Sequence, residues 1–317
     1  MTSASTALSL DPAELRLSVV IVSFKSRPAL AGCLESLIAC RQPIPLEIVV
    51  VDNASNDGTV EMLRGTYPWV QVIANAENLG FTRGVNQGFE RAQSDCVFML
   101  NPDCVVTPEA LELLLAALEA EPSLAAVAPT LLDGQGGVAR SCGRFPDLWT
   151  LLCDHLRLVY LFPDSPRLAR SRYGGWSMES LDRVDWASGA ALLVSRRAWS
   201  EIGGLDENIF MYMEDVDWCR RAARDGRAVR YIPAARIVHF GQQSSRHMPV
   251  ETYLHDLKSR VYYFRKHHGP LAALITKAIL GLTLFLKWSA ACVYYRGRKN
   301  ARMYSAGMGA VWRASWP

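Results

Sequence analysis

The chain has 317 residues, of which 50% are hydrophobic and 21% are charged. This length suffices for one large domain or two small ones with a sizeable buried core, and the composition excludes a wholly disordered protein. The formal net charge of +3 is too small to indicate nucleic-acid binding, so we expect no nucleic-acid partner.

Residues 1–16 read as an irregular leader. They lack the basic start and apolar stretch of a secretory signal, which predicts a cytoplasmic protein. The eight cysteines include no C-x-x-C pair, and most lie in apolar runs. We therefore interpret them as reduced thiols that are mostly buried.

Apolar runs alternate with helical patterns in the first part of the chain. Residues 17–24 read as a largely apolar strand, as expected of a strand buried on both faces of a parallel sheet. Ser26 is a candidate N-cap for the helix that follows. Further strands are predicted at 46–51, 70–74 and 96–100, and helices near 60–63, 84–92 and 107–119. This alternation predicts βαβ units and a mostly parallel sheet.

The pattern loosens after Pro129. Residues 133–184 are rich in Gly, Arg and Pro, and predict long loops with one helix near 148–160. A strand is then expected at 186–194, followed by helices at 196–202 and about 214–224, which end at glycines.

Polar clusters follow three of the predicted strands. Ser23 follows the first strand, the segment 52–59 (Asp-Asn-Ala-Ser-Asn-Asp-Gly-Thr) follows the second, and 101–103 (Asn-Pro-Asp) follows the fourth. Ligands of open α/β sheets bind beyond the carboxyl ends of the strands. Taken alone, however, segment 52–59 is more typical of a polar turn with a helix cap.

Two common nucleotide-binding motifs are absent. Neither a G-x-G-x-x-G fingerprint after the first strand nor a Walker P-loop is present, which disfavours an NAD enzyme and a P-loop NTPase. The segment 24–28 (Phe-Lys-Ser-Arg-Pro) also lacks the glycines expected of a nucleotidyltransferase loop.

Six segments in this order resemble glycosyltransferase family 2, in particular its rhamnosyltransferase-like branch. The segments, spread over about residues 17–245, are 19–24, 50–59, 78–88 (Asn-Leu-Gly-Phe-Thr-Arg-Gly-Val-Asn-Gln-Gly), 100–103, 188–190 and 204–217. The resemblance implies a GT-A-like fold with a mixed, mostly parallel sheet over residues 17–245. It also implies a nucleotide-sugar donor and a divalent cation, Mg²⁺ or Mn²⁺.

The resemblance assigns the metal site to the end of the fourth strand. Asn101 replaces the first aspartate of the family's Asp-x-Asp motif, so Asp103 is the expected carboxylate ligand. Hard oxygen ligands suit these cations, which neutralise the diphosphate leaving group. His239 matches a position that completes the metal site in this fold, although a lone histidine at a strand end is as readily structural.

The same resemblance implies contacts to the nucleotide sugar. Asp52 matches the position that binds the base or ribose, and residues 78–86 form a loop and helix start suited to phosphate and ribose. For Arg83 the alternative is an ordinary surface charge. The expected donor-binding residues are Ser23, Phe24, Asp52, Asn53, Asn78, Gly80, Arg83, Asn86 and Asn101.

Inversion at the anomeric carbon requires a base that deprotonates the acceptor hydroxyl. The resemblance places it in Glu214-Asp215, and we expect Asp215 to be the base, kept ionised by the start of its helix. Glu214 is the alternative. Asp217 is expected to be a surface partner of Arg220 or Arg221.

Aromatic faces suit sugar rings. We expect an acceptor-binding floor, with protein core as the alternative for the same residues. Its members are Trp186, Ser188, Gly189 and Trp218.

These features predict an inverting, metal-dependent glycosyltransferase of cell-surface polysaccharide synthesis. The expected donor is dTDP-L-rhamnose, with UDP-sugars as the alternative, and the acceptor is a glycan or a lipid-linked glycan. A non-catalytic glycan-binding or scaffold protein is the rival, which retention of Asp103 and Asp215 disfavours.

Residues 246–317 predict a helical, basic appendage. Residues 271–293 are long enough to cross a bilayer, but Lys277 and Lys287 interrupt them. Spaced ten apart, the two lysines fall on one side of a helix, as in a helix that lies in the membrane interface. Basic residues follow at 296, 298, 299, 302 and 313, and aromatic residues lie at 288, 294 and 295. We expect peripheral binding to the cytoplasmic membrane face; packing on the catalytic domain or in an oligomer is the alternative.

Overall fold

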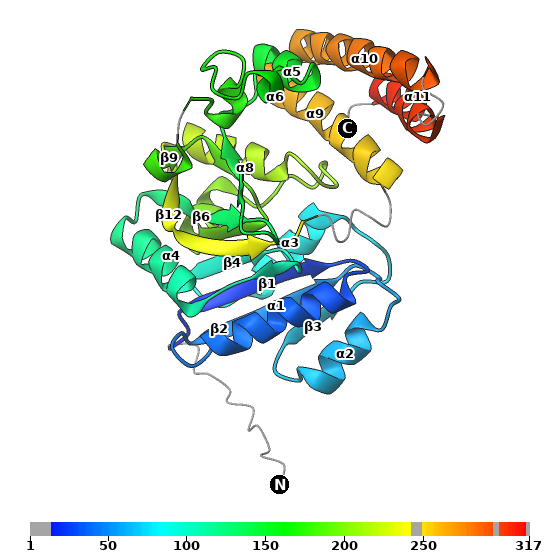
Figure 1. Cartoon of the computed structure of the whole chain (residues 1–317). Coiled ribbons are helices and arrows are strands. Elements are labelled where there is room, and N and C mark those ends of the chain that lie inside the picture. Colours follow the sequence, from blue (N-terminus) through cyan, green and yellow to red (C-terminus); the bar gives the residue numbers. More distant parts are fainter. Residues whose placement is uncertain (1–13, 176, 242–248, 294–297, 315–317) are drawn as a thin grey trace.

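A computed structural model describes residues 14–175, 177–241, 249–293 and 298–314. A mixed sheet with helices on both faces occupies most of the chain, and a group of helices follows it (Figure 1). The expected change of region near residue 245 and most of the leader lie outside the described residues, as do residues 294–297 of the basic tail.

The first half of the chain forms the βαβ units that the sequence predicts. Its elements are β1 (Leu17–Ser23), α1 (Arg27–Cys40), β2 (Leu46–Asp52), α2 (Thr59–Thr66), β3 (Gln71–Ala74), α3 (Phe81–Arg91), β4 (Cys96–Leu100) and α4 (Pro108–Ala120). Strands β3, β2, β1 and β4 are parallel neighbours. Ser26 occupies the N-cap of α1, but its hydroxyl contacts the Ser23 hydroxyl instead of capping the helix.

The second half completes the sheet. It comprises β5 (Cys104–Val105), β6 (Leu124–Leu132), β7 (Val138–Ala139), β8 (Cys142–Gly143), α5 (Leu148–His155), α6 (Leu158–Leu161), β9 (Arg183–Val184), β10 (Trp186–Ala187), β11 (Ala191–Ser195), α7 (Arg196–Ile202), α8 (Glu214–Arg224) and β12 (Ala228–His239). The main strand order is β3-β2-β1-β4-β11-β6-β12-β5, and β11 runs antiparallel to both of its neighbours.

Three features of this half depart from the sequence-based expectations. Strand β6 was missed because it is rich in alanine and contains Pro129. Strand β12 was missed because Pro233 lies within it, where its register also shifts between Ile232 and Arg236. The single strand expected at 186–194 is two strands in different sheets, β10 with β8 and β11 in the main sheet, separated by residues 188–190.

The sheet separates two hydrophobic clusters. On one face α1 and α4 contribute Leu34 and Leu114, and on the other α3, α7 and α8 contribute Phe89, Ala198 and Trp218. Burying such side chains stabilises the fold by about 1.5–3 kcal/mol each. Six cysteines are buried, Cys96 is partly buried and Cys292 is exposed, all as free thiols, so the prediction that most are buried is confirmed.

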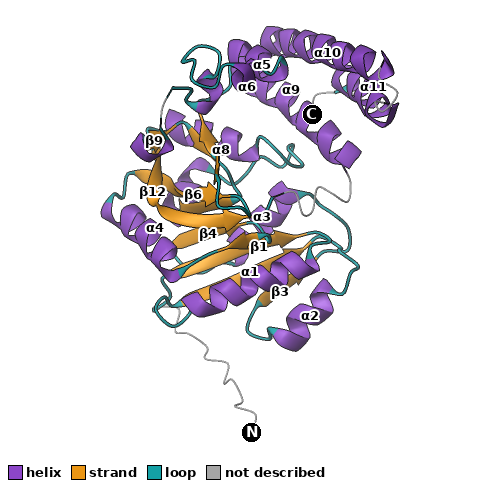
Figure 2. Cartoon of the chain, in the orientation of Figure 1, coloured by secondary structure: helices purple, strands orange, loops and turns teal. Residues whose placement is uncertain are grey.

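A third cluster holds the C-terminal helices together. Helices α9 (Pro249–His268), α10 (Pro270–Val293) and α11 (Arg298–Arg313) lie beside α5, with no strand among them (Figure 2). Their shared core includes Leu151, Leu257, Phe264, Leu284 and Val311. Because α5 belongs to the middle of the chain, this packing ties the appendage to the segment that follows the sheet.

Asp217 joins α8 to α9. Its side chain is fully buried and bonds to Arg221, Lys266 and His267 at 3.0, 2.7 and 2.7 Å. Arg221 is therefore a partner, as expected, but the expected surface position is wrong. Burial raises the pKa of the Asp217 carboxyl, but hydrogen bonds from His267 and Lys266 outweigh it and lower the pKa to about 2.

We expect Asp217→Asn to destabilise the fold by about 3 kcal/mol, because breaking a buried ion pair costs about 3–5 kcal/mol and the partner cations are partly exposed. The folded-state pKa of Asp217 lies below the unfolded one. Its contribution is therefore complete above about pH 4 and is lost as the pH falls towards 2. Urea unfolding between pH 2 and 7 should show a shallower loss of stability for the variant than for the wild type. Parallel curves would contradict this assignment.

Candidate functional site

A cavity of about 740 Å³ opens at the carboxyl end of the sheet. Its wall combines the end of β4, the end of β12, the break between β10 and β11, the start of α8, and α9. Residues from widely separated parts of the chain thus face one space, at the edge of the sheet where α/β proteins bind ligands.

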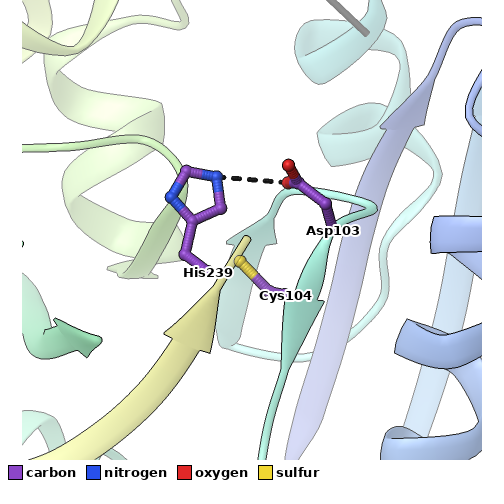
Figure 3. Close-up of side chains that lie close together, drawn as sticks. All are labelled: Asp103, Cys104 and His239. Carbon is purple, nitrogen blue, oxygen red and sulfur yellow. Dashed lines mark ion pairs between the residues drawn. The ribbon is translucent and has the colours of Figure 1, made fainter. Parts of the chain in front are cut away.

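Asp103 and His239 form the candidate metal centre (Figure 3). The His239 Nε2 atom lies 3.1 Å from Asp103 Oδ1 and 3.3 Å from Asn101 Nδ2. The short strand pair β5–β12 sets this distance, because Cys104 and His239 are direct partners in its register. A carboxylate and an imidazole, completed by phosphate and water oxygens, suit Mg²⁺ or Mn²⁺.

Cys104 lies beside this pair but is a poor ligand. Its thiol is buried and donates to the Ala190 carbonyl at 3.4 Å. Burial raises the pKa of this thiol well above its ordinary value. The thiolate needed to bind a metal is therefore disfavoured.

Glu214 and Asp215 begin α8 and line the same cavity. Asp215 accepts hydrogen bonds from the backbone N–H groups of Gly189 at 3.1 Å and Val216 at 2.7 Å. Burial raises the pKa of Asp215 above its ordinary value even though both bonds lower it. This corrects the expectation that the helix start dominates, and it makes the carboxylate a stronger base.

Glu214 has a different environment. Its side chain is 6% exposed, and its Oε2 atom is buried without a hydrogen-bond partner among the described residues. Burial and the neighbouring Asp215 raise the pKa of Glu214 well above its ordinary value. Of the two carboxyls, Asp215 is thus the one better held as an ionised acceptor of protons.

The backbone around these acids is constrained. Tyr212 and Met213 both have left-handed conformations, with φ of 64° and 70°, which is uncommon for residues other than glycine. A Cβ on Gly189 would lie 2.9 Å from Met99 Sδ and 3.8 Å from Asp215 Cβ. Gly189 therefore lets the β10–β11 break approach the base closely.

The expected acceptor residues divide into two groups. Trp186, Ser188 and Gly189 line the cavity. Trp218 does not: it is 1% exposed, packs near Trp199 in the core and donates to the Gly203 carbonyl at 3.0 Å. The expectation that Trp218 forms part of the acceptor floor is therefore wrong, and its core alternative is correct.

The expected nucleotide residues of β1 and β2 lie side by side. Ser23 pairs with Asp52 in the strand register, and Asn53 donates its backbone N–H to the Ser23 carbonyl at 2.9 Å. Asp52 accepts hydrogen bonds from the Ser55 backbone and hydroxyl, which fix its carboxylate. Phe24 follows, partly buried. Their role in donor binding stays a prediction.

Residues 78–80 form a loop before α3, and its glycine cannot be replaced by another residue without strain. Gly80 has φ of 88°, and a Cβ there would lie 2.7 Å from the Phe210 carbonyl oxygen. Asn78 accepts the Gly80 N–H at 3.0 Å, and Asn53 donates to the Gly80 carbonyl at 2.9 Å. This loop therefore touches both the nucleotide segment and the segment before α8.

Arg83 and Asn86 bind the segment 205–207 instead of facing the cavity. Arg83 pairs with Glu207 at 3.4 Å. Asn86 exchanges hydrogen bonds with the Leu205 backbone at 2.9 and 3.0 Å. We assign Asn86 a positioning role, because its amide is occupied, and the surface-charge alternative for Arg83 agrees with its ion pair.

Four arginines in the cavity wall were missed by the sequence analysis. They are Arg140, Arg144, Arg172 and Arg260. Three of them lie in residues 133–184, where the sequence shows neither a helical nor a strand periodicity that would mark a buried face. Arg260 lies in the predicted C-terminal appendage. The only available signal was the Arg-x-x-x-Arg spacing of the first two.

Comparison with known proteins agrees with this site. Residues 18–164 match the model of "Glycosyl transferase family 2". The N-acetylglucosaminyl-diphospho-decaprenol L-rhamnosyltransferase of Mycobacterium tuberculosis is 31% identical over 80% of this chain and 85% of its own length. The chain belongs to glycosyltransferase family 2. Rhamnosyltransferase WbbL of Escherichia coli is 24% identical over 57% of this chain and 66% of its own length.

Solved structures identify the fold of this family 2 transferase as GT-A. The mannosyltransferase PcManGT from Pyrobaculum calidifontis, in complex with GDP-Man and Mn²⁺, aligns with a TM-score of 0.55 at 18% identity, covering 96% of this chain and 89% of its own. TarS from S. aureus (residues 1–349) aligns with a TM-score of 0.51 at 14% identity, covering 95% and 93%. The predicted family, fold class and enzyme class are confirmed.

Proposed function

We propose that this enzyme moves L-rhamnose from dTDP-L-rhamnose, with inversion, to a sugar on a lipid-linked diphosphate in cell-surface polysaccharide synthesis. The observation that carries the proposal is that Asp215 and the Asp103–His239 pair line the same cavity. The similarity to the mycobacterial rhamnosyltransferase supports the sugar and the acceptor. A UDP-sugar is the alternative donor.

In this proposal the metal centre and the base have separate tasks. Asp103 and His239 would hold a divalent cation, which when bound would neutralise the charge of the nucleotide diphosphate. Asp215 takes the proton of the acceptor hydroxyl as the new glycosidic bond forms. The N–H groups of Gly189 and Val216 hold the carboxylate in place before the reaction.

The direct test is a donor and acceptor panel. The purified enzyme, with Mg²⁺ or Mn²⁺, is given dTDP-L-rhamnose or UDP-sugars together with N-acetylglucosaminyl diphosphate linked to an alkyl chain. Formation of the rhamnosylated product, with the anomeric configuration read by NMR, supports the proposal. Turnover with UDP-sugars alone would replace the donor, and no turnover with any donor and acceptor would contradict it.

We further propose that α10 docks on a membrane surface. It is the one helix among the described residues that is long and apolar enough to cross a bilayer, and 33% of its apolar window is buried. Its outer face is an apolar stripe of Leu271, Leu274, Ile275, Leu282, Phe285, Leu286 and Val293, each at least 38% exposed. Lys277 faces away from this stripe and donates to the Ala314 carbonyl at 3.1 Å.

Further exposed apolar residues lie at the end of α6 and directly after it. Tyr160, Leu161 and Phe162 are 61%, 68% and 51% exposed, and α5 packs directly on α10. An exposed apolar surface of this extent is typical of a binding surface. Membrane docking would confine the enzyme to the surface that holds a lipid-linked acceptor.

A triple variant tests the docking without removing α10, whose inner face is part of a core. We expect Leu282→Ser, Phe285→Ser and Leu286→Ser together to lower binding to anionic liposomes at least about tenfold, because each side chain loses up to about 1.5–3 kcal/mol of burial. Flotation of the full chain measures this. Ile38→Ser with Leu113→Ser, on helices α1 and α4, is the matched control. Equal flotation of the triple variant and wild type would contradict the proposal.

A further inference from the structure

Three arginines line the cavity without a counter-charge. Among the residues that the structure describes, no carboxylate oxygen lies within 4.0 Å of the charged nitrogens of Arg140, Arg144 or Arg172. The neighbouring Arg170, by contrast, pairs with Asp147 at 2.9 Å, and Arg260 pairs with Asp256 at 3.0 Å. These three guanidinium groups therefore have no ion-pair partner among the described residues, although Arg172 acts at longer range on Asp154 in the same wall.

Neutral groups hold these side chains in place. The Arg144 guanidinium lies 4.9 Å from the centre of the Tyr173 ring. That of Arg172 lies 4.6 Å from the centre of the Tyr160 ring and donates to its hydroxyl at 2.8 Å. Arg140 donates to the Arg172 carbonyl. Stacked, immobilised guanidinium groups keep their full charge and lose little entropy when they bind an anion.

The arginines lie between the base and the apolar rim. On the inner side, the Ser188 N–H donates to the Ser141 carbonyl at 2.7 Å, and the Trp186 ring N–H donates to the Arg144 carbonyl at 3.0 Å. Ser188 in turn precedes Gly189, which bonds to Asp215. On the outer side, Arg172 contacts Tyr160, where the exposed apolar residues 160–162 begin.

This order of groups matches the order of groups in one class of ligand. A glycan on a lipid diphosphate presents a sugar hydroxyl, then a diphosphate, then a hydrocarbon chain. The cavity presents a base, then free arginines, then an apolar surface. Arginine forks bind phosphate oxygens through paired hydrogen bonds. The nucleotide-sugar donor also carries a diphosphate. The proposed function assigns that diphosphate to the Asp103–His239 pair, at the ends of β4 and β12.

We propose that Arg140, Arg144 and Arg172 bind the diphosphate of the lipid-linked acceptor. This inference rests on the proposed function and adds the residues that select the acceptor class. It also gives a role to the arginines of the cavity wall, which the metal centre does not use. The enzyme should accordingly distinguish an acceptor with a diphosphate from the same sugar without one.

Binding of an alkyl diphosphate without a sugar tests the site directly. Titration calorimetry in EDTA keeps the metal centre from contributing. We expect Arg144→Gln with Arg172→Gln to weaken binding about 10- to 100-fold, because each removes a charge-assisted contact. Arg170→Gln, two positions away and paired with Asp147, is the matched control. Single variants serve if the double variant has a lowered melting temperature.

Kinetics then separate this inference from the proposed function. We expect the double variant to raise KM for N-acetylglucosaminyl alkyl diphosphate while leaving KM for dTDP-L-rhamnose unchanged, and to have no effect with the alkyl glycoside. Raised KM for the donor instead, or unchanged affinity for the alkyl diphosphate, would overturn the inference. Intact binding of the alkyl diphosphate without sugar transfer would overturn the proposed function alone.

Discussion

Asp215→Asn should lower kcat by about 10²–10⁴-fold, the usual contribution of one positioned base, while leaving donor affinity unchanged. Asparagine keeps the size of the side chain and one oxygen for the N–H of Gly189 or Val216, so the fold should persist. Single-turnover rates at saturating donor, together with calorimetric donor affinity, measure the two effects separately.

The pH profile gives a second readout. A general base acts only when deprotonated, so kcat/KM should fall at low pH as Asp215 takes up a proton. Because burial raises the pKa of Asp215, this acid limb should lie above the ordinary aspartate value of 3.8. The residual activity of Asp215→Asn should not show this fall of kcat/KM at low pH.

Glu214→Gln is the matched control for the neighbouring acid. Burial raises the pKa of Glu214 well above its ordinary value and so disfavours its ionised form, which makes the neutral glutamine a conservative replacement. We expect less than about a tenfold loss of kcat. If Glu214→Gln loses most of the activity while Asp215→Asn retains it, the base is Glu214.

The sequence predicted those parts of the fold in which an apolar strand is followed by polar residues and a helix. The apolar runs of β1, β2 and β4 and the polar residues that follow them placed Ser23, Asp52 and Asp103 at one edge of the sheet. The pairing of β5 with β12 then brings His239 within 3.1 Å of Asp103, although 136 positions separate them in the chain. Only the resemblance to family 2, and no local pattern, indicated this contact.

Tertiary contacts decide what the sequence left undetermined. Asp217 reads as a surface charge in an acidic helix start, yet Lys266 and His267 of α9 bury it. Trp218 reads as a sugar platform, yet α7 and α8 enclose it in the core. The predicted roles failed for the same physical reason: the partners that determine burial lie on elements distant in the chain.

The arginines of the cavity show a related limit. In the sequence, Arg140, Arg144 and Arg172 lie among other arginines such as Arg170, and nothing distinguishes them. The structure does so through their partners, because Arg170 has a carboxylate and the other three face the cavity. Whether an arginine has an ion-pair partner depends on the fold, and the amino-acid composition does not show it.

Asp103→Ala should abolish metal-dependent nucleotide binding and lower turnover by at least about 100-fold. The physical reason is that a bound cation contributes several kcal/mol to charge neutralisation, and each 1.36 kcal/mol is a factor of ten in rate. His239 would remain as the one side chain of the pair, and a single neutral imidazole holds Mg²⁺ or Mn²⁺ poorly. Calorimetry with dTDP, with and without Mn²⁺, measures the binding effect.

The metal-free measurement makes this prediction specific. If Asp103 acts through the cation, the variant and the wild type should bind dTDP equally in EDTA and differ only when Mn²⁺ is added. Asp182→Ala, an exposed aspartate that pairs with Arg230, is the control and should behave as the wild type does. Equal affinities of variant and wild type in saturating Mn²⁺ would remove Asp103 from the metal site. Equal loss with and without Mn²⁺ would instead mean that Asp103 supports the cavity structurally, through its backbone bond to Phe240 and the β5–β12 pair.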